Sequence, residues 1–181
     1  DRNGVVGLVL ANGSLSTVSG GEGDIRKNIV EADLVEAIVA LPAQLFSNTQ
    51  IPACIWILNK NKTQKGKTLF VDTRDVGYML DRKQKAFSDK DVESIADTFH
   101  NWRNSSNYED VAGQYYSATT KEIEKQGYIL TPGRYVGIVE VEGDGVSFSD
   151  KMSTLTATLS EQFEESEKLE DQIKNNLAGI G

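Results

Sequence analysis

The run Leu34-Val-Glu-Ala-Ile-Val-Ala-Leu41 decides the fold, because it is almost continuously apolar and stops at Pro42. A strand with one solvated face alternates apolar and polar residues, whereas a strand buried on both faces does not need to. The run therefore predicts an interior strand of an α/β sheet that is covered by helices on both faces.

Strand and helix also alternate before this run. The apolar segment Val5–Leu10 is predicted to be a central strand of the same sheet. Asp24 is placed to cap a short helix that turns Ile25, Ile29 and Val30 toward the sheet. Because the chain begins at Asp1 and enters a buried strand almost at once, we expect it to be the later part of a longer polypeptide.

Two further strands are predicted at residues 53–59 and 68–72. The connections that lead into them are too short for a helical crossover, so each strand should run antiparallel to its predecessor. Ligands of open parallel sheets bind outside the carboxyl ends of the strands, which places the loop 42–52 on the ligand edge. The lysine-rich tip at residues 60–67 falls on the opposite edge, where we interpret its lysines as keeping the sheet edge soluble.

Composition narrows the classes of protein and of site. The chain has 181 residues, of which 39% are hydrophobic and 25% charged, so it can bury a core. It has neither a secretory signal pattern nor an apolar run of the roughly 18 residues that a membrane span needs, so we expect a cytoplasmic location. The single cysteine, Cys54, excludes a disulfide framework and is interpreted as a buried, inert thiol; no metal site is predicted.

The C-terminal tail is acidic and carries an apolar stripe. Residues 140–181 hold 3 basic and 10 acidic residues, so the tail is not a nucleic-acid surface. A helix from about Asp150 to Leu177 would align Met152, Leu155, Leu159, Phe163, Leu169, Ile173 and Leu177. Such a helix needs a partner surface, either its own domain or a helical bundle.

Six ordered segments carry a resemblance to a known family: Gly7–Leu15, Glu22–Lys27, Asp33–Pro42, Phe46–Leu58, Ile95–His100 and Leu130–Val136. In sequence and spacing they resemble the C-terminal part of the modification subunit of type I restriction-modification systems, over essentially the whole chain. The resemblance implies a DNA methyltransferase that methylates adenine N6 with S-adenosylmethionine. It also implies the C-terminal half of a Rossmann-like methyltransferase sheet with antiparallel last strands, followed by a helical extension.

The resemblance also shows what this chain lacks. The family's glycine-containing cofactor loop and its Asn-Pro-Pro-aromatic catalytic motif precede the first strand and are not in this sequence. We therefore predict no catalytic residue here, and we expect the chain alone to be inactive. Three departures from the family pattern, Ala11, Ser16 and Gln50, could change the shape of the loops around the substrate.

The loop 42–52 carries the residues that the resemblance assigns to the substrate base. Adenine N6 cannot be reached inside a duplex, so the base must be flipped out and held against an aromatic or apolar face. Phe46 occupies the position of the family's stacking aromatic, with core packing as the alternative. Asn48 and Thr49 are secondary candidates, although such residues also cap turns.

A basic cluster precedes the helix predicted at residues 89–103. Arg82, Lys83 and Lys85 are candidates for contacts with DNA phosphates.

The predicted organisation has three parts. Residues 1–75 complete the methyltransferase sheet, residues 76–149 form a helix and loop extension, and residues 150–181 form a partner-binding helix. In the family, C-terminal helices pack against the specificity subunit. The implied partners are that specificity subunit, the restriction subunit and double-stranded DNA, and self-association through the helix stays open. The candidate partner residues are Leu155, Leu159, Phe163, Leu169, Ile173 and Leu177. The alternative function is a non-enzymatic helical module for assembly.

Overall fold

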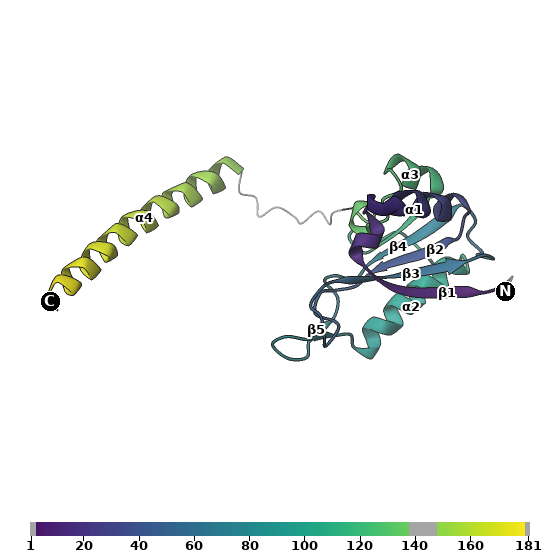
Figure 1. Ribbon diagram of the computed structural model, residues 1–181, viewed down its shortest axis with the longest axis horizontal. Coiled ribbons are helices and arrows are strands. Elements are labelled where there is room, and N and C mark those ends of the chain that lie inside the picture. Colours follow the sequence, from purple (N-terminus) through teal and green to yellow (C-terminus); the bar gives the residue numbers. More distant parts are fainter. Residues whose placement is uncertain (1–2, 138–147, 180–181) are drawn as a thin grey trace. The chain divides into compact units, whose positions relative to one another are not determined.

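The computed structural model describes residues 3–137 and 148–179. The chain divides into two compact units, residues 1–139 and residues 140–181. The first unit is an α/β domain, and the second contains one long helix, α4 (Phe148–Ala178) (Figure 1). Within the described residues, no helix combines the length and the apolar character that crossing a bilayer requires.

A five-stranded mixed sheet organises the first unit. Its strands are β1 (Val5–Ala11), β2 (Val35–Ala40), β3 (Ala53–Asn59), β4 (Lys67–Asp72) and β7 (Tyr115–Thr119), in the spatial order β1-β3-β2-β4-β7. β2 and β4 are parallel neighbours, and the other neighbouring pairs are antiparallel. The α/β class and the reversals of direction at β3 and β4 are therefore confirmed. β4 pairs with β2 and not with β3, because the chain crosses over β2 to reach its far side.

Helices cover both faces of this sheet. α1 (Glu22–Glu31) and α3 (Thr120–Lys125) lie on one face, and α2 (Asp89–Arg103) lies on the other (Figure 1). Short 3-10 turns, η1 (Asn12–Leu15), η2 (Ser19–Gly21) and η3 (Pro132–Arg134), connect these elements. A separate two-stranded hairpin consists of β5 (Tyr78–Met79) and β6 (Lys85–Ala86).

The core has one apolar cluster on each face of the sheet. Beneath α1 and α3, the rings of Phe70 and Tyr135 stack with their centroids 3.9 Å apart. On the other face, Trp102 of α2 packs against alternating residues of β2 and β4. All six residues of β2 are buried, which confirms the predicted interior strand.

Two predictions about the first elements are wrong. β1 is an edge strand with all seven residues exposed, since it pairs only with β3 in the described part of the chain. Asp24 does not cap α1; the N-cap is Gly21, whose φ of 81° suits glycine, and Asp24 lies in the first turn. Val30 is buried as predicted, but Ile25 is 58% exposed.

One lysine of the turn between β3 and β4 differs from its interpretation, whereas Lys60, Lys65 and Lys67 are exposed. Lys62 is 3% exposed, and its Nζ donates to the carbonyls of Val35 at 2.9 Å and Lys67 at 2.7 Å. The same ammonium lies 2.6 Å from the carboxylate of Asp33. Lys62 therefore fixes the turn from inside and does not keep the edge soluble. Cys54 is buried as predicted, and burial raises the pKa of its thiol.

Candidate functional site

The carboxyl ends of three strands meet at one edge of the sheet. β1, β2 and β4 run in the same direction, because β1 and β2 are both antiparallel to β3 and β4 is parallel to β2. The register pairs Ala11 with Ala53, Ala40 with Cys54, and Ala40 with Asp72, so the three strands end at the same level. The segments that follow them, including the loop 42–52, therefore emerge together at the edge where ligands of such sheets bind.

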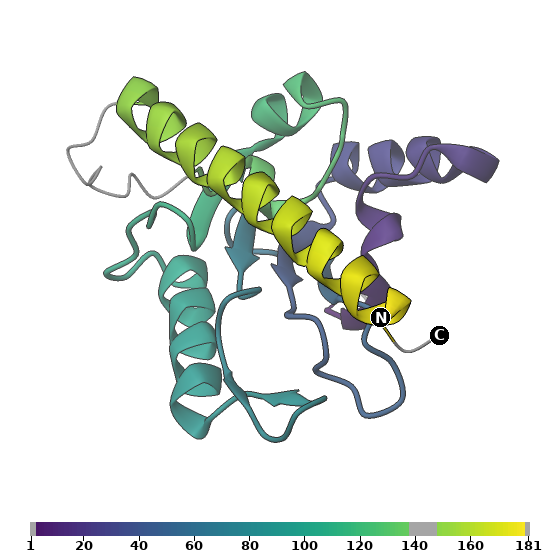
Figure 2. The same ribbon diagram turned by 90° about the vertical axis from the view of Figure 1, so that its left-hand side faces the viewer.

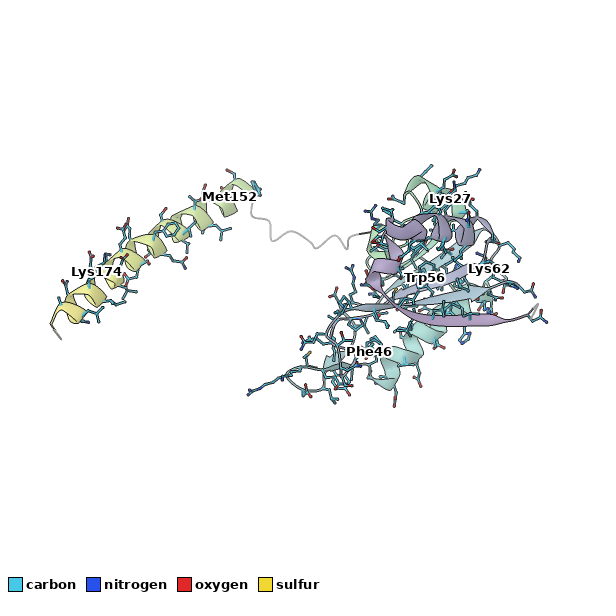
Figure 3. All side chains as sticks on the ribbon, in the orientation of Figure 1. Lys27, Phe46, Trp56, Lys62, Met152 and Lys174 are labelled. Carbon is cyan, nitrogen blue, oxygen red and sulfur yellow. The ribbon has the colours of Figure 1, made fainter. Side chains whose placement is uncertain are left out.

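Phe46 lies at the surface of this edge. It opens a tight turn in which the Thr49 N–H donates to the Phe46 carbonyl at 3.4 Å. The neighbouring Leu45 packs against the apolar cluster under α2, whereas Phe46 belongs to neither cluster and is 36% exposed. The loop is thus anchored by Leu45, whereas Phe46 stays partly exposed; Figure 3 labels its place in the first unit.

The polar candidates on the same loop differ in their surroundings. The Thr49 hydroxyl accepts a hydrogen bond from the Ile51 N–H at 3.2 Å, so it already helps to hold the turn. The side chain of Asn48 is exposed. Asn48 is therefore the freer of the two to meet a ligand.

The β5–β6 hairpin is fastened to the Phe46 loop. The Lys85 N–H donates to the Gln44 carbonyl at 2.9 Å, and the Lys85 Nζ donates to the Arg74 carbonyl at 3.2 Å. Gly77 has a φ of 93°, and a Cβ added there would lie 2.6 Å from the Ala86 carbonyl oxygen. The structure therefore brings the basic cluster to the same edge as Phe46, a neighbourhood that the sequence reasoning left undecided (Figure 1).

The members of the basic cluster are not equivalent. One carboxylate oxygen of Asp81 accepts from the N–H groups of Lys83 at 2.7 Å and Gln84 at 2.8 Å, which closes the tip of the hairpin. Arg82 and Lys83 are exposed at that tip, whereas Lys85 is half-buried at the base. Two of the three cations are thus available to an anion.

An ion pair supports the chain between β4 and the hairpin. Arg74 Nε and Nη2 donate to the carboxylate of Asp72 at 2.9 and 2.6 Å, and this hydrogen bonding raises the pKa of Arg74. The turn η3 packs closely on the pair, since a Cβ added to Gly133 would lie 2.7 Å from Arg74 Nη2. The Thr73 hydroxyl also donates to the Ala40 carbonyl at 2.6 Å. The base of the site is therefore held by specific contacts.

The glycines before α1, Gly20 and Gly21, do not match an anion-binding loop. They serve the positive φ angles of the turn, and Glu22 and Asp24 in the first turn of α1 would repel an anionic group. In the described part of the chain, no group of three His, Cys, Asp or Glu residues is arranged to hold a metal ion.

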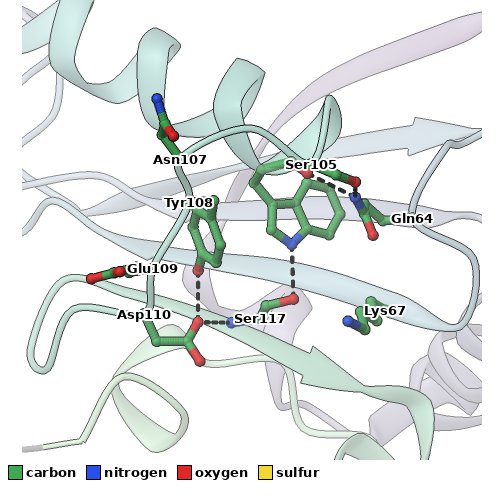
Figure 4. Close-up of a pocket in the computed structure, with 9 residues that line it drawn as sticks. Gln64, Lys67, Ser105, Asn107, Tyr108, Glu109, Asp110 and Ser117 are labelled. Atoms are coloured by element: carbon green, nitrogen blue, oxygen red, sulfur yellow. Dashed lines mark hydrogen bonds between the residues drawn. The ribbon is translucent and has the colours of Figure 1, made fainter.

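A polar cavity of about 590 Å³ lies at the opposite edge, between the C-terminal end of α2 and strands β4 and β7 (Figure 4). Its groups satisfy one another: the Tyr108 hydroxyl and the Ser117 N–H both donate to Asp110 at 2.8 Å. Trp102 Nε1 donates to the Ser117 hydroxyl at 2.8 Å. The pKa of Tyr108 is raised, mainly by burial and to a smaller extent by the hydrogen bond to Asp110. These hydrogen bonds join the end of α2 and the segment after it to β7, so we assign this cavity a structural role.

The apolar stripe predicted in the tail lies on α4, and all seven of its residues are exposed. Their exposed fractions run from 46% for Met152 to 65% for Leu177. A stripe of this length would be costly to leave in water, so it needs a surface that covers it.

Comparisons with known proteins agree with the resemblance. The family model for N-6 DNA methylases matches residues 1–144. The chain is 56% identical over 179 residues to the methylase subunit of the type I restriction enzyme HindI from Haemophilus influenzae, covering 99% of this chain. It is 39% identical over 183 residues to the methylase subunit of the type I restriction enzyme MjaIX from Methanocaldococcus jannaschii, again covering 99% of this chain.

A solved structure gives the same result. The crystal structure of the type I restriction-modification methyltransferase subunit from Streptococcus thermophilus matches with a TM-score of 0.67 and 30% identity, over 76% of this chain and 28% of that one. The chain spans 40% and 32% of the lengths of the HindI and MjaIX subunits.

Proposed function

From the premise that this chain belongs to the N-6 DNA methylase family, we propose that the complete protein is the modification subunit of a type I restriction-modification system. It methylates adenine N6 in double-stranded DNA, with S-adenosylmethionine as the methyl donor. A specificity subunit and a restriction subunit complete the assembly. The identity of 56% to a type I methylase subunit over nearly the whole chain supports this proposal.

In this proposal the sheet described above is the C-terminal half of a Rossmann-like methyltransferase sheet. The cofactor loop and the catalytic motif lie in the part of the complete protein that this chain does not contain. The residues of this chain therefore bind and orient DNA, and no bond-making step is assigned to them. Residues 1–75 supply four of the five strands of this sheet, residues 76–149 add α2 and the fifth strand β7, and residues 150–181 bind a partner.

One observation carries the role in DNA binding: an exposed Phe46 stands at the carboxyl edge of the sheet, on a loop that is hydrogen-bonded to a basic hairpin. Stacking of a base on an aromatic ring is worth about 1–3 kcal/mol, which offsets much of the cost of flipping the base out. Asn48 and Thr49 supply polar groups beside the ring. Arg82 and Lys83 contact phosphates, and Lys85 fixes the hairpin from which they project.

The test is a set of substitutions at Phe46 in the complete enzyme. Phe46→Ala and Phe46→Leu remove the ring, and Phe46→Tyr keeps it. We expect the first two to weaken binding of a duplex with a mispaired target adenine by about 5- to 100-fold, with cofactor binding unchanged. Phe46→Tyr should bind like the parent. Equal loss of DNA and cofactor binding, or loss of folding, would assign Phe46 to the core.

The stripe on α4 supports a second role in assembly. We propose that Leu155, Leu159, Phe163, Leu169, Ile173 and Leu177 pack against helices of the specificity subunit. Their exposure in the second unit, flanked by glutamates, fits a helical bundle.

A further inference from the structure

The β5–β6 hairpin carries an exposed apolar tip that the fold does not explain. Tyr78, Met79 and Leu80 are consecutive, and their exposed fractions are 50%, 48% and 58%. Tyr78 and Met79 form β5 and project from opposite faces of the hairpin, and Leu80 follows them at the start of the turn. None of the three belongs to either apolar cluster of the described residues. Adjacent exposed apolar residues of this size indicate contact with a partner.

Positive charge surrounds this tip. Residues 72–88 contain four cationic residues and three carboxylates, in a chain whose net charge is −8, and Asp72 is paired with Arg74. The Asp81 carboxylate is occupied by the backbone N–H groups of the turn, whereas Arg82 and Lys83 directly follow the apolar residues and are exposed. Apolar side chains flanked by cations are complementary to duplex DNA, which has charged phosphates outside and stacked bases inside.

The hairpin is also held in place. Asp81 closes its turn, Gly77 allows a close approach to Ala86, and Lys85 ties its base to Gln44 and Arg74. These bonds fix the tip relative to the loop that carries Phe46. An element that must enter a partner at a defined place benefits from such support.

We infer that this hairpin enters a groove of duplex DNA beside the target adenine and fills the space that the flipped base leaves. Met79 and Leu80 pack against the neighbouring bases, and Arg82 and Lys83 contact the flanking phosphates. Proteins that open base steps commonly insert apolar side chains in this way, with cations on the backbone. The inference rests on the proposed function, because it needs DNA as the substrate and Phe46 as the residue that holds the extruded base.

The test compares two variants of the complete enzyme. The double variant Met79→Ser/Leu80→Ser removes the apolar tip, and Val92→Ser changes an exposed apolar residue on α2, 53% exposed, as the matched control. We expect the double variant to bind a fully paired target duplex about 10- to 100-fold more weakly than the control. A duplex with a mispaired target base should show a smaller loss, because its opening costs less. With 2-aminopurine at the target position, binding of the parent enzyme should raise the fluorescence, and binding of the double variant should not.

A double variant that matches Val92→Ser in affinity and in 2-aminopurine fluorescence would overturn the inference. The Phe46 variants separate this outcome from a failure of the proposed function. If Phe46→Ala selectively weakens DNA binding while the Met79→Ser/Leu80→Ser variant binds normally, the proposed function stands and the insertion of the hairpin into DNA is rejected. A defective tip variant with no selective loss in Phe46→Ala rejects the base-holding role of Phe46 and overturns the inference, because the hairpin then contacts DNA without filling the gap of a flipped base.

A cross-link gives a readout that does not depend on affinity. Cys54 is buried, so Leu80→Cys supplies the accessible thiol of this chain for a benzophenone label. We expect the labelled hairpin to cross-link to target DNA. Cross-links to protein alone would make the tip a subunit contact and overturn the inference.

Discussion

The ion pair between Arg103 and Glu36 gives a sharp test of what holds α2 on the sheet. Glu36 is 0% exposed, and its carboxylate lies 3.0 Å from Arg103 Nε and 3.1 Å from Nη2. Asn59 Nδ2 donates to it at 3.0 Å. Arg103→Met keeps an apolar stem but leaves a buried carboxylate with one neutral donor. Breaking a buried pair costs about 3–5 kcal/mol, and we expect about 3 kcal/mol because Arg103 is itself 28% exposed and admits water.

Urea denaturation measures this loss as a lower free energy of unfolding at an unchanged m-value. A loss of about 3 kcal/mol corresponds to a fall in Tm of about 6–12 °C for a domain of this size. The matched control is Lys27→Met, which breaks an exposed pair with Glu31 on α1 at 3.8 Å and should cost less than about 1 kcal/mol. Glu36→Leu combined with Arg103→Met should recover much of the stability. If Arg103→Met loses no more than Lys27→Met, the buried pair does not hold α2.

Three further predictions concern the hairpin, a helix cap and α4. Gly77→Ala should expose the hairpin to limited proteolysis and weaken DNA binding by the complete enzyme, whereas Gly66→Ala, at a φ of 67° in open space, should leave both unchanged. Hydrogen bonds from Thr119 and Tyr116 hold the pKa of Glu122 below its usual 4.5. The stability that the Glu122 carboxylate contributes is therefore present above that pH and is lost as the pH falls. Glu122→Gln should make the free energy of unfolding depend less on pH in this acid range. Phe163→Lys should abolish co-elution with the specificity subunit in size-exclusion chromatography, and Ser166→Lys, outside the stripe, should not.

The fold was predictable where local chemistry is decisive. Helix α2 begins and ends at the predicted residues, and its start is fixed by the capping box that the Ser88 hydroxyl and the Asp91 side chain form. The strand β2 was predicted from continuous apolar character, which requires burial on both faces. The same character misplaced β1, since a sequence indicates which residues favour burial and not which neighbours are present. β7 was not predicted, because Tyr115–Thr119 consists of two adjacent tyrosines followed by three small residues and shows no run of apolar residues.

The candidate site was predictable in its position and not in its composition. The direction of the strands placed the loop of Phe46 on the ligand edge. The union of that loop with the hairpin depends on a backbone bond from Lys85 to Gln44, and side-chain identity does not encode such a bond. The interpretation of Lys62 was wrong for a related reason: lysine usually indicates solvent, but its ammonium meets the Asp33 carboxylate and the Val35 carbonyl from a distant segment and the Lys67 carbonyl of its own turn.

Charge separates the partners of the two units. The sheet edge with Phe46 carries exposed cations next to apolar side chains, which suits a polyanion whose bases have been opened. The second unit carries 10 carboxylates against 3 cations in residues 140–181, and this balance repels DNA from α4. Under the proposed function, the exposed stripe of α4 is the surface that meets a protein, and one chain holds DNA through its first unit and a protein partner through its second.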